Sequence, residues 1–170
     1  MTRHPGGEAF TRRLIELAEL PGGSSVLDMG AGAGESLVLL RAMGYAAEGI
    51  DLEPKSPQVT QGNFLQPAYP DGSFDGVLSQ CAFLVSGRQR EALRAAHRLL
   101  RAGGTLMLAD VFFEDPVLLL QNAGFTVVHA EDQSSLWLEY YLEALWRDGA
   151  PCCEIPKGKS RYLLMIGRKE

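Results

Sequence analysis

The sequence predicts an α/β fold in three layers, with a mostly parallel, seven-stranded sheet between two layers of helices. Apolar runs of strand length alternate with helical segments along the chain, a pattern typical of parallel sheets covered on both faces. The chain has 170 residues and is 46% hydrophobic, which is enough for one domain with its own core. No boundary interrupts the alternation, so residues 1–170 are predicted to form a single domain.

The first half of the chain opens with a helix. Residues 8–20 place apolar side chains at helical spacing, and Pro21, Gly22 and Gly23 end that helix. Residues 25–29 are a short apolar run that runs into a glycine-rich turn, as a buried strand does. The next helix is predicted at residues 35–43. Further strands are predicted at residues 45–51, 58–64 and 75–80.

The second half continues the alternation. Residues 88–101 carry apolar side chains on one side of a helix, and two glycines follow. Residues 116–122 fit a short helix, with proline in its first turn and Gly124 past its end. A third helix, rich in aromatic residues, is predicted at 133–147. The remaining strands are predicted at residues 105–110, 125–130 and 161–168. The helix and loop before the last strand allow that strand to insert antiparallel.

Composition excludes several partners and settings. A formal net charge of −5 argues against nucleic acid, because phosphate binding needs a surplus of Lys and Arg. No apolar run approaches the roughly 20 residues of a membrane span, and the N-terminus has no apolar core of a signal peptide. The three cysteines cannot form a disulfide framework, so we expect a reducing, cytoplasmic setting. Their spacing matches no zinc pattern, so no metal site is predicted, and the role of Cys152 and Cys153 stays open.

The sharpest feature of the sequence is the glycine-rich turn VLDMGAGAGE. Gly30, Gly32 and Gly34 follow the first predicted strand and lead into a helix. Such a turn brings backbone N–H groups to a helix start, where they favour a carboxylate or another anion. About twenty residues later Asp51 ends the second strand, where its carboxylate can accept hydrogen bonds from ribose hydroxyls. Together these features predict a nucleoside site.

The identity of the nucleoside follows from two departures from the dinucleotide pattern. The third glycine comes one residue earlier than in the usual fingerprint. In addition, Asp28 stands two residues before the first glycine, where a carboxylate repels a pyrophosphate and suits a cationic amino group. The ligand is therefore expected to carry a ribose, a carboxylate and a cation, as S-adenosylmethionine does.

The sequence resembles the class I S-adenosylmethionine-dependent methyltransferases, whose fold is Rossmann-like. VLDMGAGAGESLVLL is similar to their first motif and GIDLEP to their second; NFLQPAYPDGSFDGVLSQCAFL and LLRAGGTLMLADV match later segments. Among relatives it looks most like the small-molecule group that includes the ubiquinone-biosynthesis and arsenite methyltransferases. The resemblance implies methyl transfer by in-line displacement to a small-molecule acceptor, with S-adenosylhomocysteine as product.

The resemblance assigns the methionine end of the cofactor and its sugar. Asp28, Gly30 and Gly32 line the methionine end, and Gly34 starts the following helix. Asp51 binds the ribose. The catalytic residues remain unidentified, because the side chains that could reach the acceptor form no recognisable constellation.

The same resemblance places five more residues around the cofactor. Leu52 packs beside the adenine, which Asn63 contacts through its side-chain amide and Phe64 through its backbone or ring. Ser79 and Gln80, at the end of the fourth strand, face the sulfonium and the acceptor. Asn63 replaces the usual Asp of the family, which removes a charged acceptor. Residues 53–57 are too few and too rich in proline for the helix that normally follows the second strand, so that helix is predicted to be shortened or absent.

The role of the aromatic helix near the C-terminal end of the sequence stays open. The helix SLWLEYYLEALW, from Ser135 to Trp146, is apolar around most of its circumference. Leu138, Leu142 and Leu145 are expected to pack on the sheet, while the surplus aromatics roof the acceptor pocket or form a homodimer contact. His4 is expected to be an exposed side chain without a functional role.

Two alternative functions remain open. One is a catalytically weak, cofactor-binding partner or regulatory subunit, and the other is a nicotinamide oxidoreductase.

Overall fold

A computed structural model describes residues 4–148 and 159–170 of the chain and shows one sheet of seven strands. The helices are α1 (Gly7–Leu17), α2 (Glu35–Ala42), α3 (Gln89–Leu99), α4 (Pro116–Asn122) and α5 (Ser134–Asp148). The strands are β1 (Ser25–Met29), β2 (Ala46–Asp51), β3 (Thr60–Gln61), β4 (Phe74–Gln80), β5 (Leu100–Phe112), β6 (Phe125–Asp132) and β7 (Arg161–Lys169). Their order across the sheet is β3-β2-β1-β4-β5-β7-β6.

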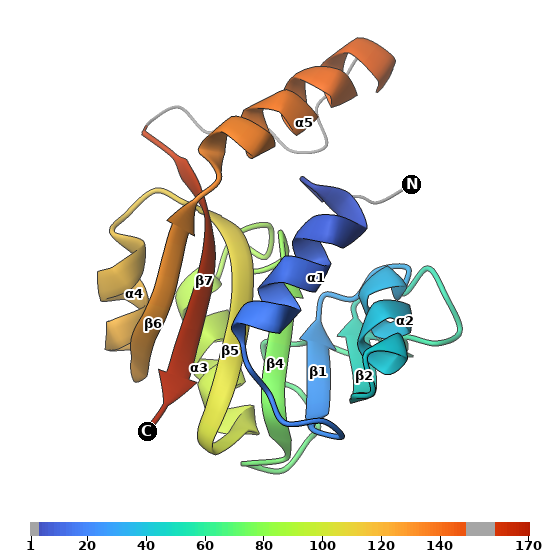
Figure 1. Ribbon diagram of the computed structural model, residues 1–170, viewed down its shortest axis with the longest axis vertical. Coiled ribbons are helices and arrows are strands. Elements are labelled where there is room, and N and C mark those ends of the chain that lie inside the picture. The colour runs from blue at the N-terminus through green and yellow to red at the C-terminus, as the bar shows by residue number, and fades with distance from the viewer. Residues whose placement is uncertain (1–3, 149–158) are drawn as a thin grey trace.

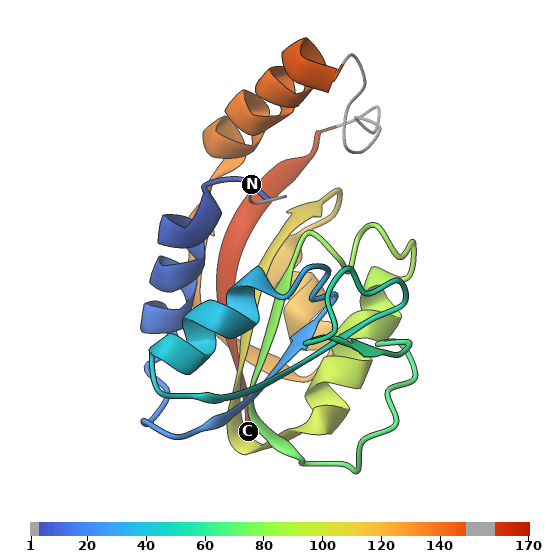
Figure 2. The same cartoon turned by 90° about the vertical axis from the view of Figure 1, so that its right-hand side faces the viewer.

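The topology confirms the predicted three-layer α/β fold. The strands from β3 to β5 pair in parallel, while β7 inserts between β5 and β6 and runs antiparallel to both. Helices α1 and α2 cover one face of the sheet, and α3 and α4 cover the other (Figures 1 and 2). Each pair buries its apolar side chains against the face it covers, so the core has two halves divided by the sheet. None of the helices in the described ranges has the length and apolar character that a membrane crossing requires.

The connection from β2 to β4 differs from the predicted strand at 58–64. Only Thr60 and Gln61 pair with β2. The chain then turns, because the Asn63 side chain accepts a hydrogen bond from the N–H of Leu65 at 2.9 Å. No helix lies between β2 and β3, which confirms the prediction from the short, proline-rich interval.

The junction of α3 and β5 also differs from the predicted boundaries. The helix ends at Leu99, and β5 begins at once with Leu100, which is extended and pairs with Phe74. The Lys169 ammonium donates hydrogen bonds to the carbonyl oxygens of His97 and Leu100 at 2.8 and 2.7 Å. This cation, from the far end of the chain, satisfies the carbonyl groups that a helix end leaves unpaired.

Helix α5 lies beyond the sheet and does not pack as predicted. It follows β6 and projects from the end of the molecule at which α1 begins (Figures 1 and 2). Its buried side is formed by Tyr141 and Ala144, whereas Leu138 and Leu142 are 48% and 46% exposed and Leu145 is half-buried. The expectation for Leu138 and Leu142 was wrong, because an almost wholly apolar helix does not reveal which side faces the protein.

Candidate functional site

The glycine-rich turn adopts the left-handed backbone that its sequence suggested. Gly30 and Gly32 have φ values of +90° and +53°, a region that side chains other than glycine rarely occupy. A Cβ on Gly30 would lie 2.4 Å from the Cβ of Ala82, so the turn packs tightly there. A Cβ on Gly32 would meet no atom within 4 Å. Gly32 therefore presents bare backbone to open space, as close approach by a ligand requires.

Most N–H groups of this turn are engaged within the protein, which corrects the expectation that they form an open anion cradle. The N–H groups of Gly30 and Ala31 both donate to the carbonyl of Ile50, at 2.9 and 3.1 Å. That of Gly34 donates to the Ala31 carbonyl at 2.7 Å, and that of Gly32 donates to the Asp51 carboxylate at 2.9 Å. These bonds fix the shape of the turn and leave its anion-binding capacity small.

Asp28 lies beneath the turn and is almost completely buried. Burial raises the pKa of its carboxyl from the usual 3.8 to about 7, although a 2.5 Å hydrogen bond from the Ser36 hydroxyl favours the charged form. The nearby Asp51 carboxylate also disfavours ionisation. A buried carboxyl of this kind gains from a cationic partner, because the partner restores the charged state that desolvation opposes.

Asp51 ties the end of β2 to the glycine-rich turn. One of its carboxylate oxygens accepts the Gly32 N–H and the other accepts the N–H of Glu53, both at 2.9 Å. Each oxygen has a second lone pair, so the carboxylate can still accept hydrogen bonds from a diol. The position predicted for ribose binding thus also holds Gly32 in place.

Replacing Asp51 tests this position. Asp51→Ala is expected to lower the affinity for S-adenosylhomocysteine by about 1.5–3 kcal/mol, because charged hydrogen bonds are lost. Calorimetric titration measures the change, with Glu53→Gln as a matched removal of charge from the same loop, where affinity should stay within about twofold. An Asp51→Ala protein of unchanged affinity contradicts the ribose assignment.

The three residues predicted to contact adenine share one edge of the sheet but differ in exposure. The Gly62 N–H donates to the Asp51 carbonyl at 2.9 Å, which brings the segment after β3 against the end of β2. Leu52 is 57% exposed and Asn63 is exposed, so both are available to a flat ring. Phe64 is buried, with its ring centroid 5.7 Å from that of Phe83. Only its backbone remains for the role that the sequence suggested.

Ser79 and Gln80 point to opposite sides of β4, as neighbours in a strand do. The Ser79 side chain is fully buried and donates a 2.8 Å hydrogen bond to the carbonyl of Met29, so it joins β4 to β1 inside the sheet. Gln80 lines a cavity at the end of β1. Of these two predicted residues, Gln80 alone reaches the site.

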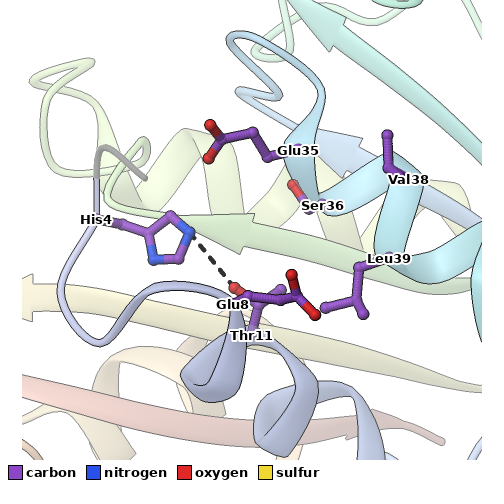
Figure 3. A pocket seen from close by; sticks show the side chains of 7 residues that line it. All are labelled: His4, Glu8, Thr11, Glu35, Ser36, Val38 and Leu39. Carbon is purple, nitrogen blue, oxygen red and sulfur yellow. Dashed lines mark hydrogen bonds between the residues drawn. The ribbon is translucent and has the colours of Figure 1, made fainter. Parts of the chain in front are cut away.

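The cavity has a volume of about 320 Å³ and opens over the glycine-rich turn. Besides Gln80 and the turn, its walls include Asp28, His4, Glu35 and Ser36. A second cavity of about 400 Å³ lies between α1 and α2 and shares His4, Glu35 and Ser36 with the first (Figure 3). The predicted residues Asp28, Gly30, Gly32 and Gln80 are thus brought together in one cavity.

Three residues at these cavities, His4, Thr11 and Ser36, were not among the predicted cofactor contacts. His4 is not idle: it lines both cavities, and its Nε2 lies 3.4 Å from the Thr11 hydroxyl (Figure 3). Burial lowers the pKa of His4, which favours its neutral form. Thr11 is buried on the inner side of α1, and Ser36 contacts Asp28. The one available signal was a hydroxyl among the inward-facing apolar residues of the first helix.

The ends of β4 and β5 carry two further polar groups, Cys81 and Asp110. Asp110 is buried, and desolvation raises the pKa of its carboxyl to about 6. It accepts hydrogen bonds from the N–H groups of Leu84 and Val111, at 3.0 and 2.8 Å, and so anchors the loop after β4. The Cys81 thiol lies 3.7 Å from the Tyr162 hydroxyl. Cys152 and Cys153 lie outside the described residues.

The fold and the glycine-rich turn define the chain as a Rossmann-like protein, and comparisons with known proteins narrow this class. A family model described as a methyltransferase domain matches residues 27–108. The uncharacterized methyltransferase YodH of Bacillus subtilis is 25% identical over 158 residues, which cover 81% of this chain and 67% of that protein. The arsenite methyltransferase of Aquipseudomonas alcaligenes is 28% identical over 115 residues, covering 53% of this chain. The match spans 33% of that relative's length.

Solved structures share the fold at lower identity. The [4+2]-cyclase SpnF superposes with a TM-score of 0.78 and 20% identity, over 99% of this chain and 87% of that one. Phosphoethanolamine N-methyltransferase 2 of Haemonchus contortus, solved with S-adenosyl-L-methionine, gives 0.77 and 13%, over 99% and 54%. At such identities the likeness describes architecture alone.

The matching family model and the curated methyltransferase relatives support a class I S-adenosylmethionine-dependent methyltransferase. The matched family model begins in β1 and ends in β5, so it contains the glycine-rich turn, Asp51 and Gln80. S-adenosylmethionine is the cofactor of this family, and the transferase class that the sequence suggested is confirmed.

Proposed function

We propose that this chain transfers the methyl group of S-adenosylmethionine to a small-molecule acceptor, releasing S-adenosylhomocysteine. The observation that carries the proposal is the juxtaposition of buried Asp28 with the bare backbone of Gly32 in one cavity. A carboxyl raised to a pKa of about 7 by burial fits an ammonium group. The open space over Gly32 fits a ligand that lies directly on the backbone.

In this proposal the residues of the chain bind the cofactor and orient it for methyl transfer. When bound, S-adenosylmethionine supplies an electrophilic methyl group on its sulfonium. Asp28 holds the ammonium of the methionine moiety, Asp51 accepts from the ribose, and exposed Leu52 packs on the adenine. In-line displacement needs alignment and exclusion of water, which a rigid turn beneath the ligand supports. A general base is required only if the acceptor must lose a proton.

Turnover by the purified chain tests the proposal. The protein is incubated with S-adenosylmethionine and a panel of amines, thiols, phenols, quinols and arsenite, and release of S-adenosylhomocysteine is measured. We expect release that depends on one acceptor class and is absent in Asp28→Asn. Cofactor binding without release across the panel contradicts methyl transfer to these acceptors and favours a cofactor-binding partner subunit, for which the comparisons give no support. A cytoplasmic location remains a prediction.

The exposed side of α5 supports a homodimer as a second part of the proposal. Leu138, Leu142 and Trp146 are spaced by four residues and are 48%, 46% and 89% exposed. They form one apolar stripe, which is costly to leave in water. Alongside it runs a second row at the same spacing, formed by exposed Glu139, Glu143 and Arg147.

The charged row beside the stripe is complementary to the same row of a second copy of the chain. If two α5 helices pack antiparallel about Leu142, the row beside the stripe meets the same row of the partner. Glu139 then lies opposite Arg147 of the partner subunit, and this pair occurs twice by symmetry. Glu143 meets its own copy, so that position opposes association.

Charge exchange tests the pairing by analytical ultracentrifugation. Arg147→Glu is expected to weaken the dimer about tenfold, and adding Glu139→Arg should restore it, because the pair is rebuilt with reversed charges. Glu143→Gln is expected to tighten it. A wild-type chain that is monomeric at all concentrations up to about 100 μM overturns the dimer, since specific homodimers are far tighter.

A further inference from the structure

The side chain of Gln80 joins the N-terminal helix to the cofactor cavity. Its Oε1 accepts a hydrogen bond from the Thr11 hydroxyl at 3.1 Å. Its Nε2 is buried and is, within the described ranges 4–148 and 159–170, the one buried side-chain polar atom that lacks a hydrogen-bond partner. Because leaving a buried donor unpaired is costly, such an atom in a side chain that lines a cavity points to a missing acceptor.

The chemistry of the cavity narrows what that acceptor is. The other polar side chains in its walls include the carboxyl groups of Asp28 and Glu35, which suit cations and repel anions. The N–H groups of Gly30, Ala31, Gly32 and Gly34 already donate within the protein. A ligand with both an ammonium and a carboxylate therefore finds a place for the ammonium at Asp28, while its carboxylate needs a donor other than these four N–H groups.

We propose that Gln80 Nε2 donates to the carboxylate of the methionine moiety, and that Gln80 thereby selects the cofactor by its amino-acid tail. The inference deepens the proposed function and rests on it. Asp28 and Gln80 then bind the two charged groups of that tail from the neighbouring strands β1 and β4. An adenosine derivative that lacks the carboxylate leaves the Gln80 donor unpaired and is discriminated against.

Thr11 acts here as a positioning residue. Its hydroxyl lies 3.1 Å from Gln80 Oε1, 3.3 Å from the Gly7 carbonyl and 3.4 Å from His4 Nε2. The hydroxyl has one proton, and donating it to Gln80 Oε1, the nearest of the three, leaves Nε2 as the free end of the amide. Helix α1 and the segment before it thus control the amide without touching the nucleoside. Recognition of the tail depends on the N-terminal helix being docked.

Binding of two cofactor forms tests the role of Gln80. Calorimetric affinities for S-adenosylmethionine and decarboxylated S-adenosylmethionine are compared in the wild-type chain, Gln80→Met and Gln80→Glu. We expect Gln80→Met to lower the affinity for S-adenosylmethionine at least tenfold and to leave that for the decarboxylated form within about twofold. Gln80→Glu keeps an acceptor for Thr11 but presents a negative charge, so it should favour the decarboxylated form.

The controls separate this inference from the proposed function. Gln121→Glu, on the exposed side of α4, makes the same chemical change away from the cavity and should alter neither affinity. Thr11→Val should lower the affinity for S-adenosylmethionine a few-fold and leave that for the decarboxylated form unchanged. If both Gln80 variants keep the wild-type ratio of the two affinities, or lose both affinities equally, Gln80 does not bind the carboxylate. If the wild-type chain binds neither form, the proposed function itself fails.

Discussion

Asp28→Asn is expected to abolish cofactor binding while making the ligand-free protein more stable. At pH 7 the unfolded chain ionises this carboxyl freely, whereas burial in the folded state raises its pKa from 3.8 to about 7. The neutral amide avoids that penalty and can still accept the hydrogen bond from Ser36. We expect a gain of about 2–4 kcal/mol in the free energy of unfolding at pH 7. The affinity for S-adenosylmethionine should fall at least a hundredfold, since the partner of its ammonium is lost.

The pH dependence has a defined sign. Asp28 contributes stability to the folded state that is fully present below about pH 4 and is lost as the pH rises through about 7. Cofactor binding needs the ionised carboxylate, so affinity should be constant above pH 7 and fall by up to tenfold per unit below it. Asp71→Asn, an exposed carboxylate before β4, is the matched control and should change neither property. A variant that binds normally shows that Asp28 does not face the ammonium.

Gly32→Val is expected to block the site. The added side chain occupies the open space above the turn, where we place the ligand, so the affinity for S-adenosylhomocysteine should fall at least a hundredfold. The left-handed backbone, with φ of +53°, adds a cost of about 1–2 kcal/mol to the free energy of unfolding. Thermal denaturation and calorimetry measure the two effects.

Gly103→Val separates strain from blocking. Gly103 has φ of +76° and also has no atom within 4 Å of an added Cβ, but it lies at the start of β5, outside the cavity. The control should lose similar stability and keep its affinity. Equal affinities in both variants would show that the ligand does not approach Gly32.

Sequence periodicity predicted the order of the elements well, because buried strands and amphipathic helices have distinct repeats and glycines separate them. Periodicity did not predict the boundaries of two elements, whose ends are formed by hydrogen bonds from side chains. The third strand stops at Gln61 because Asn63 turns the chain through its own side chain. The carbonyl groups at the end of α3 accept hydrogen bonds from Lys169, about seventy residues away, which no local pattern reveals.

The lining of the candidate site was predictable where one short segment forms it. Asp28, Gly30 and Gly32 line one cavity as expected, because the turn joins a strand directly to a helix and their spacing defines their geometry. His4 and Thr11 reach the same cavity from a separate helix, and only tertiary packing brings them there. Ser79 and Gln80 were both assigned to the cofactor, although neighbours in a strand point to opposite sides. The side chain of Ser79 bonds to Met29 inside the sheet, and that of Gln80 lines the cavity.

Calorimetric titration of the wild-type chain with S-adenosylhomocysteine at pH 8 tests the central claim most directly. At this pH the Asp28 carboxyl is mostly ionised before the ligand binds, so it can pair with the ammonium of the ligand without first losing a proton. We predict saturable binding of one nucleoside per chain, with a dissociation constant of about 1–100 μM, the range of a ligand this size held by two charged contacts. No heat of binding at millimolar ligand, in a chain shown to be folded, would contradict the account.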